Sequence, residues 1–166
     1  MMTEELIRFE NFFLRPSEIL ISNLNKDTEC EEYEGYNFLL DNKNVKYRKA
    51  KKTPKKIGQF VTLWKRNTAG QTEPFDVEDD FDYYIVALEN DKSFGFFLFP
   101  KEVLGKHNIL TNSQKKGKRG LRLYAEWDLP ESKQADKTKS WQGEYFIKLG
   151  ENENKRKFDL IFNSNF

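Results

Sequence analysis

The stretch Tyr47–Arg66 reads YRKAKKTPKKIGQFVTLWKR and concentrates positive charge in one part of the 166-residue chain. It contains no Asp or Glu, and aromatic side chains are interspersed with its cations. The cations are Arg48, Lys49, Lys51, Lys52, Lys55, Lys56, Lys65 and Arg66, and the aromatics are Tyr47, Phe60 and Trp64. This composition indicates a surface that faces a polyanion or a set of nearby acids.

The middle of this stretch predicts the start of a helix. Thr53 followed by Pro54 is typical of an N-cap and the first helical position, so we expect exposed backbone N–H groups there. The helix dipole disfavours Lys55 and Lys56 in the first turn unless an anion binds beside them. The run Gln59–Lys65 alternates in its side chains and predicts a strand that is buried on both sides.

Charged residues are segregated along the chain, although the formal net charge is only +1. Acidic blocks lie on both sides of the basic stretch, at residues 29–34 and 73–82. A second segment without carboxylates, Lys106–Arg122, follows later. We expect it to converge with Lys46–Arg66 on one positive face. The alternative is a solvated rim of lysines paired with acids from elsewhere.

Several classes of protein are excluded or disfavoured by composition. The single cysteine, Cys30, excludes an internal disulfide, and with the single histidine, His107, it does not provide an ordinary Cys/His zinc site. A catalytic Cys30–His107 pair is disfavoured because an acidic segment disfavours the thiolate. The N-terminus lacks the apolar core of a signal peptide, and no apolar run approaches the ~20 residues that a membrane helix needs. We therefore expect a cytoplasmic protein without a membrane partner.

The hydrophobic patterns predict one α+β domain over residues 1–166, with a mixed, mostly antiparallel sheet flanked by helices. Strands are expected at residues 36–40, 45–50, 59–65, 81–88, 94–99, 121–124 and 158–162. Helices are expected at residues 4–14, from 16 to 24, from 101 onward and at 132–146. Polar or exposed loops are expected at residues 27–35, 67–80 and 151–157.

The chain contains no phosphate-binding loop, dinucleotide-binding glycine motif, nucleophile-elbow serine or metalloprotease histidine pair. The sequence contains part of the residue pattern for one reaction class, metal-dependent phosphodiester hydrolysis. It requires an acid at one strand and an acid-x-lysine triplet on the next. Asp82 is the candidate first acid and a weak candidate metal ligand. The next strand, Phe94–Phe99, has neither acid nor lysine, and Glu89 with Lys92 only approximates the triplet.

Several blocks of this sequence resemble the MepB family. They occur in the family's order and are Ala50–Arg66, Phe96–Leu104, Gly117–Asp128 and Lys137–Phe146. The resemblance covers Tyr36–Phe146 and implies a bacterial protein with a fold similar to restriction endonucleases and a degraded catalytic motif. Some members are encoded beside a multidrug efflux pump and its regulator. Phe96 departs from the glutamine expected in relatives, which makes the resemblance to an active nuclease weaker.

Together these features predict a non-catalytic nucleic-acid-binding protein that needs no cofactor and contacts the phosphates of DNA or RNA. The expected contacts are Arg48, Lys49, Lys51, Lys55, Lys56, Lys65, Arg66, Lys118, Arg119 and Arg122. Tyr47, Trp64 and Trp141 are candidate stacking residues, although such aromatics more often lie in a core. Two alternatives stay open: a Mg²⁺-dependent nuclease with a nonstandard site around Asp82, and a protein-interaction adaptor of an efflux or stress operon. The sequence also leaves open whether a homodimer forms.

Overall fold

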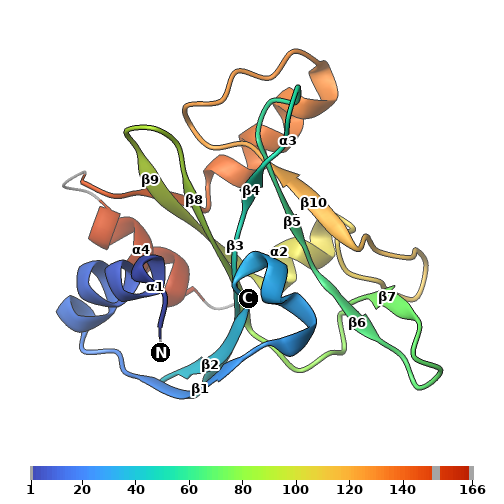
Figure 1. Cartoon of the computed structure of the whole chain (residues 1–166), viewed down its shortest axis with the longest axis horizontal. Helices are drawn as coiled ribbons and strands as arrows, with labels where there is room; N and C mark the ends of the chain where they lie inside the picture. Colours follow the sequence, from blue (N-terminus) through green and yellow to red (C-terminus); the bar gives the residue numbers. More distant parts are fainter. Residues whose placement is uncertain (1, 151–153, 165–166) are drawn as a thin grey trace.

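A six-stranded sheet forms the centre of the molecule, in the order β1-β2-β3-β8-β9-β11 (Figure 1). The computed structural model describes residues 2–150 and 154–164. All neighbouring strands of this sheet pair antiparallel except β3 and β8, which are parallel. The predicted mixed, mostly antiparallel sheet is therefore confirmed. The strands are β1 (Ile21–Lys26), β2 (Tyr36–Leu40), β3 (Lys43–Lys49), β8 (Tyr83–Glu89), β9 (Phe94–Pro100) and β11 (Phe146–Lys148).

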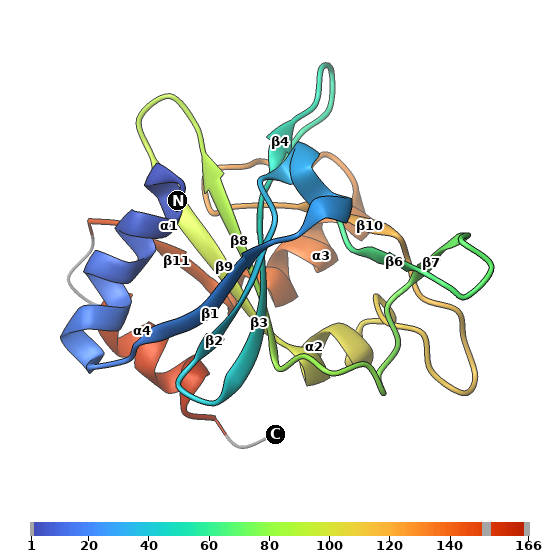
Figure 2. The ribbon, with the colours of Figure 1, turned by 60° about the horizontal axis from the view of Figure 1, so that its bottom comes forward.

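Two smaller sheets lie to one side of the central sheet (Figure 2). The first has the order β10-β5-β4 and is entirely antiparallel. The second is a hairpin of β6 and β7. Their strands are β4 (Lys51–Lys52), β5 (Gln59–Thr62), β10 (Gly120–Leu123), β6 (Trp64–Arg66) and β7 (Thr72–Pro74). The chain reaches the first small sheet directly from the end of β3, through Ala50.

Helical segments occur at both ends of the chain and between the strands. They are α1 (Glu4–Phe9), the π-helix η1 (Glu10–Leu14), the 3₁₀ turns η2 (Arg15–Ser17) and η3 (Thr28–Tyr33), α2 (Lys101–Lys106), α3 (Lys133–Gly143) and α4 (Asn154–Phe162). Within the described ranges, none of these helices has the length and hydropathy needed to cross a membrane.

The core consists of two clusters, one on each face of the central sheet. Strands β8 and β9 are buried on both faces, and their side chains alternate between the clusters. Ile85 and Phe96 pack with Phe9 and Phe158, so the helices of the two chain ends cover one face. The small sheet covers the other face through the buried aliphatic side chains Val61, Leu121 and Leu123, and Leu63, which follows β5, packs beside them. This three-layer arrangement leaves the opposite face of the small sheet turned away from the core.

Most of the predicted elements are confirmed. The helix over residues 4–14 is present as α1 and η1, and the predicted hairpin is formed by β2 and β3. The two most hydrophobic strands are β8 and β9, and Pro100 precedes α2. The strand over 121–124 is β10, and α3 lies within the predicted range 132–146.

The helix predicted from 16 to 24 and the strand predicted at 158–162 are wrong in type. Residues 16–24 do not form a helix, because η2 ends at Glu18 with a left-handed φ of 57° and the chain then continues as β1. β1 is extended because it hydrogen-bonds to β2 at the edge of the central sheet. The predicted strand 158–162 belongs to helix α4, in which Phe158 and Ile161 point into the core at helical spacing. The predicted turn at 151–157 is wrong over residues 154–157, which belong to α4, and its residues 151–153 lie outside the described residues.

Further boundaries differ from the prediction, and the loop predicted at residues 67–80 contains strand β7. Residues 28–33 form the 3₁₀ segment η3, which buries Cys30 and is stabilised by a hydrogen bond from Glu29 N to the Asp27 carboxylate. The predicted strand 59–65 divides into β5 and β6 at Leu63. It is buried on one side only, because Val61 and Leu63 point into the core whereas Phe60 is half-buried on the outer side.

Candidate nucleic-acid interface

The outer face of the small sheet carries a cross-strand row of two cations around an aromatic ring. Lys51 of β4 lies opposite Phe60 of β5, and Phe60 lies opposite Arg122 of β10. Directly opposed residues of antiparallel strands place their side chains on the same face. Lys51 is exposed, and Phe60 and Arg122 are half-buried. We call this outer surface, with its row Lys51–Phe60–Arg122, the basic sheet face.

The cations of this row are held next to aromatic rings. The Arg122 guanidinium lies 5.8 Å from the centroid of Phe60. Arg122 Nη1 also donates hydrogen bonds to Thr53 Oγ1 at 2.9 Å and to the Ile57 carbonyl at 3.3 Å. The Lys51 ammonium lies 4.8 Å from the centroid of Tyr33, which belongs to η3. Since arginine has five N–H donors, Arg122 keeps donors for a ligand while its orientation is fixed.

The segment between β4 and β5 is a turn, so the predicted helix start at Thr53 is wrong. Pro54 is followed by Lys55 with a left-handed φ of 65°, the combination of a type II turn. Gly58 has a φ of 83°, and a Cβ there would lie 2.5 Å from the Leu123 carbonyl, so the turn packs closely on β10. Lys55 and Lys56 project from this turn and are exposed. Neither has a carboxylate partner in the part of the chain that the structure describes.

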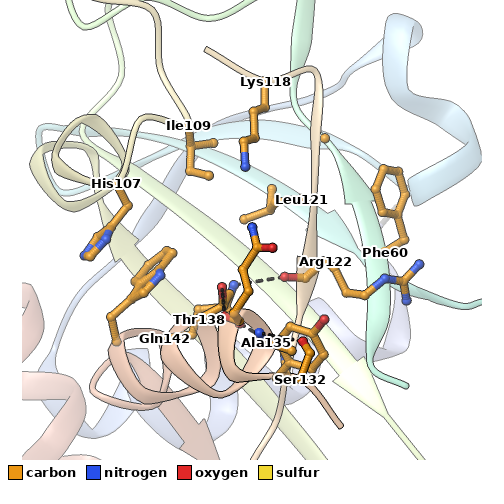
Figure 3. Close-up of a pocket in the computed structure, with 14 residues that line it drawn as sticks. Phe60, His107, Ile109, Lys118, Leu121, Arg122, Ser132, Ala135, Thr138 and Gln142 are labelled. Carbon is orange, nitrogen blue, oxygen red and sulfur yellow. Dashed lines mark hydrogen bonds between the residues drawn. The ribbon is translucent and has the colours of Figure 1, made fainter. Parts of the chain in front are cut away.

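The loop before β10 brings two more predicted cations to the small sheet. Arg119 is exposed, and its Nε and Nη2 both donate to the Thr72 carbonyl of β7 at 3.3 Å. Lys118 is exposed and extends toward Leu121 (Figure 3). The loop is anchored at Gly117, whose N–H donates to Thr111 Oγ1 at 2.9 Å. The predicted convergence of the two basic segments on one sheet is therefore present for part of the predicted set.

Arg48 does not belong to this surface, although the sequence predicted it as a contact. Its side chain is 1% exposed, and its Nη2 lies 2.6 Å from the Asp27 carboxylate. Its Nη1 donates to the Tyr47 carbonyl at 2.8 Å. Tyr47 itself is fully buried, so it does not act as a stacking residue. A guanidinium enclosed in this way joins β3 to the start of η3 and does not reach a ligand.

Three other predicted contacts are engaged with neighbouring groups. Lys49 lies 2.7 Å from Glu5 and 3.2 Å from Glu89; burial opposes its charge, but these carboxylates raise its pKa overall. Lys65 lies 2.7 Å from Asp79, and that hydrogen bond raises the pKa of Lys65. Arg66 is exposed, lies over the half-buried ring of Trp64, and donates to the Gly70 carbonyl at 2.9 Å. The carboxylates beside Lys49 and Lys65 neutralise the charge of each ammonium and occupy its hydrogen-bond donors, so either lysine attracts a phosphate more weakly.

A cavity of about 320 Å³ opens beside β10, and its functional residues were not predicted as a group (Figure 3). Helix α3 forms one wall, and Gln142 joins it to β10. The buried Gln142 amide accepts from Tyr124 N at 2.9 Å and donates to the Arg122 carbonyl at 3.0 Å. Trp141 of the same helix stacks on His107, with the two ring centroids 3.9 Å apart and the rings nearly parallel. Burial, with a smaller contribution from the neighbouring Lys106, lowers the pKa of His107.

The MepB-like family matches residues 27–148 of the chain. The chain belongs to the MepB-like family. A solved structure described as the crystal structure of MepB is 32% identical, with a TM-score of 0.79. That similarity covers 91% of this chain and 100% of the other. No curated protein matches the chain.

The region matched by the MepB-like family runs from η3 to β11 and therefore includes the basic sheet face and the cavity beside β10. The predicted family is confirmed by this match. The predicted likeness of the MepB-like fold to restriction endonucleases is not tested by these comparisons and stays a prediction. The cytoplasmic location also stays a prediction.

Asp82, the weak candidate for a metal ligand in this MepB-like protein, is hydrogen-bonded within the fold. Its carboxylate accepts from Asn44 N at 2.8 Å, across the parallel pair of β3 and β8. Its carbonyl accepts from Lys101 N at 2.9 Å, at the start of α2. On the adjacent strand, Phe96 is fully buried in the core. Among the described residues, no three His, Cys, Asp or Glu side chains are grouped in a way that could hold a metal ion.

Proposed function

We propose that this MepB-like protein binds nucleic acid through the basic sheet face without cleaving it. The observation that carries the proposal is the row Lys51–Phe60–Arg122, in which cations alternate with an aromatic ring across three strands. Cations contact phosphates without regard to sequence, and an accessible ring stacks on an unpaired base of any type. The row provides both kinds of contact on one side of a sheet.

The cations that support the proposal surround this row. Lys55 and Lys56 lie in the turn that joins β4 to β5, and Lys118 lies in the loop before β10. Because the net charge of the chain is only +1, attraction to a polyanion must come from this local group and not from the protein as a whole. If all five cations contact phosphates, the logarithm of affinity against the logarithm of salt concentration has a slope of about −4.5 for duplex DNA and about −3.5 for a single strand.

The acidic segment η3 limits the extent of this surface. Tyr33 of η3 contacts Lys51, while Glu31 and Glu32 of the same segment are exposed. These carboxylates repel a phosphate backbone on that side, so a strand is expected to lie toward β10 and the turn at Lys55. The footprint is therefore small, and moderate affinity at physiological salt is expected.

The test is fluorescence anisotropy of a short labelled duplex, and of one of its strands alone, over a salt series without divalent metal. The variant Lys55→Glu/Lys56→Glu reverses two exposed cations of the face and should lose most of the affinity at low salt. Its control is Lys43→Glu/Arg156→Glu, which changes the net charge equally at exposed positions on β3 and α4.

Equal losses in both variants would show a nonspecific charge effect and contradict the proposed face. No change in anisotropy for either nucleic acid at low salt would reject nucleic-acid binding and favour an acidic protein partner. Incubation of the bound duplex with Mg²⁺ addresses the nuclease alternative, since cleavage that is lost in Asp82→Ala would contradict a purely binding role.

A further inference from the structure

The cavity beside β10 opens onto the basic sheet face, because Phe60 and Arg122 belong to the row of that face and also line the cavity. We propose that the cavity binds a single nucleotide unit, that is, a phosphate attached to an unpaired nucleobase. This unit is available at the end of a strand held on the basic sheet face or as a free nucleoside monophosphate. The first source rests on the proposed function, and the second does not.

The size of the cavity suits one ring with a phosphate. Its volume of about 320 Å³ lies at the lower end of the range typical for small-molecule sites, roughly 300–1,000 Å³. A base pair or a duplex does not enter a cavity of this size. The ligand must therefore be an unpaired nucleotide, and a strand with a free end is expected to bind better than a blunt duplex.

The charge of the cavity suits a phosphate. None of the residues that line it is Asp or Glu, whereas Lys118 and Arg122 are both cations. The Lys118 side chain extends toward the buried Leu121, which also lines the cavity (Figure 3). Its ammonium has no carboxylate partner among residues 2–150 and 154–164. An anion that enters the cavity therefore gains charge-assisted hydrogen bonds and meets no carboxylate among these residues.

The remaining walls suit a nucleobase and its sugar. The stacked rings of His107 and Trp141 provide a flat aromatic wall. Because the pKa of His107 is lowered, its ring is neutral near neutral pH and offers both a donor and an acceptor. Ser132 Oγ accepts from Ala135 N at 3.1 Å, which leaves its hydroxyl hydrogen for a ligand acceptor. Thr138 donates to the Gln134 carbonyl at 3.1 Å and can still accept.

The cavity is formed without the ligand. Gln142, 1% exposed, bridges α3 and β10 through the two hydrogen bonds of its amide. Gly120 packs against the rim, where an added Cβ would lie 2.6 Å from Phe60 Cζ and 3.0 Å from the Val61 carbonyl. A preformed site of this kind needs little ordering when a ligand binds, which favours measurable affinity for a small molecule.

The experiment measures binding of adenosine monophosphate, uridine monophosphate and inorganic phosphate by tryptophan fluorescence and calorimetry. It also compares a single strand with a 5′-phosphate, the same strand without it, and a blunt duplex. The test variant is Lys118→Ala, and the matched control is Lys116→Ala, an exposed lysine of the same loop that does not line the cavity. Folding of both variants is checked by circular dichroism.

We expect the monophosphates to bind more tightly than inorganic phosphate, and Lys118→Ala to weaken them about tenfold or more while Lys116→Ala does not. Tighter binding of the 5′-phosphorylated strand, lost in Lys118→Ala, would identify the strand end as the source. Monophosphate binding without strand binding would identify a free nucleotide and reject the proposed function. Strand binding with no monophosphate binding and no effect of the 5′-phosphate would overturn this inference and leave the proposed function intact. If neither the monophosphates nor the strands bind, both this inference and the proposed function are overturned.

Discussion

Removal of the Asp27 carboxylate should destabilise the protein strongly, because it leaves a buried guanidinium without its counter-charge. Arg48 is 1% exposed and the Asp27 side chain is 16% exposed, with 2.6 Å between Nη2 and the carboxylate oxygen. Breaking a buried ion pair by removing one partner costs about 3–5 kcal/mol. Asp27 also accepts a hydrogen bond from Glu29 N at 3.1 Å, and losing such a cap costs about 1 kcal/mol.

Because Asp27 is not fully enclosed and water can partly replace its carboxylate, we expect Asp27→Ala to cost about 3–4 kcal/mol in the free energy of unfolding. Native domains have only about 5–15 kcal/mol in total, so the variant should be close to the limit of stability. The assay is urea unfolding followed by circular dichroism. With a slope of about 1–3 kcal/mol per molar urea, the midpoint should fall by at least about 1 M.

The matched control is Glu10→Ala, which removes a pair between side chains 3.5 Å apart in which Arg15 is 71% exposed. Exposed pairs contribute roughly 0–1 kcal/mol, so this variant should unfold near the wild-type midpoint. Asp27→Asn should lie between the two, because it keeps an acceptor for Glu29 N and loses the charge. A loss below about 1 kcal/mol in Asp27→Ala, equal to that of the control, would refute the buried position of Arg48.

Three further predictions concern the core, the pH dependence and the basic sheet face. Gly95→Ala should cost about 1–3 kcal/mol, seen as a lower thermal midpoint, because its Cβ would lie 2.4 Å from Phe146 Cζ; an unchanged midpoint would contradict that packing. The pKa of His107 is lowered below 6.5 in the folded chain, so the unfolded chain binds the proton at a higher pH than the folded chain does. The neutral His107 ring therefore contributes stability above pH 6.5, and this stability is lost as the pH falls through the folded pKa. Urea titrations from neutral to mildly acidic pH should therefore show the wild type losing stability relative to His107→Phe, and a gain would be inconsistent with a half-buried ring whose pKa is lowered. Arg122→Ala should lower the salt slope of nucleic-acid binding by about 1, whereas an unchanged slope would remove Arg122 from the interface.

The sequence determined the elements whose hydrophobic pattern is strong over a short range. Strands β8 and β9 are almost wholly apolar and were predicted correctly, as was the β2–β3 hairpin with its polar turn. The sequence also identified the MepB-like family and the two basic segments that lack carboxylates. These features are local in the chain, so a single sequence displays them completely.

Tertiary structure decided the elements with weak local preference. Residues 21–26 became β1, and residues 154–162 became α4, against the prediction in both cases. Local propensities differ by tenths of a kcal/mol per residue, whereas burying one large apolar side chain contributes about 1.5–3 kcal/mol. Pairing with β2 and packing of Phe158 in the core therefore outweighed the local pattern.

Tertiary structure also decided which of the predicted cations face solvent and what lies beside them. Composition cannot distinguish Arg48, paired with Asp27 inside the fold, from Lys55, exposed in a turn. The cavity beside β10 is built from α3, β10 and the segment around His107, which are separate in sequence, so no local pattern indicates it. The sequence thus determined how many cations and aromatic rings the chain has and where they lie along it. Long-range packing determined which of them lie in the core, on the basic sheet face or in the cavity, because burial and ion pairing depend on residues that are distant along the chain.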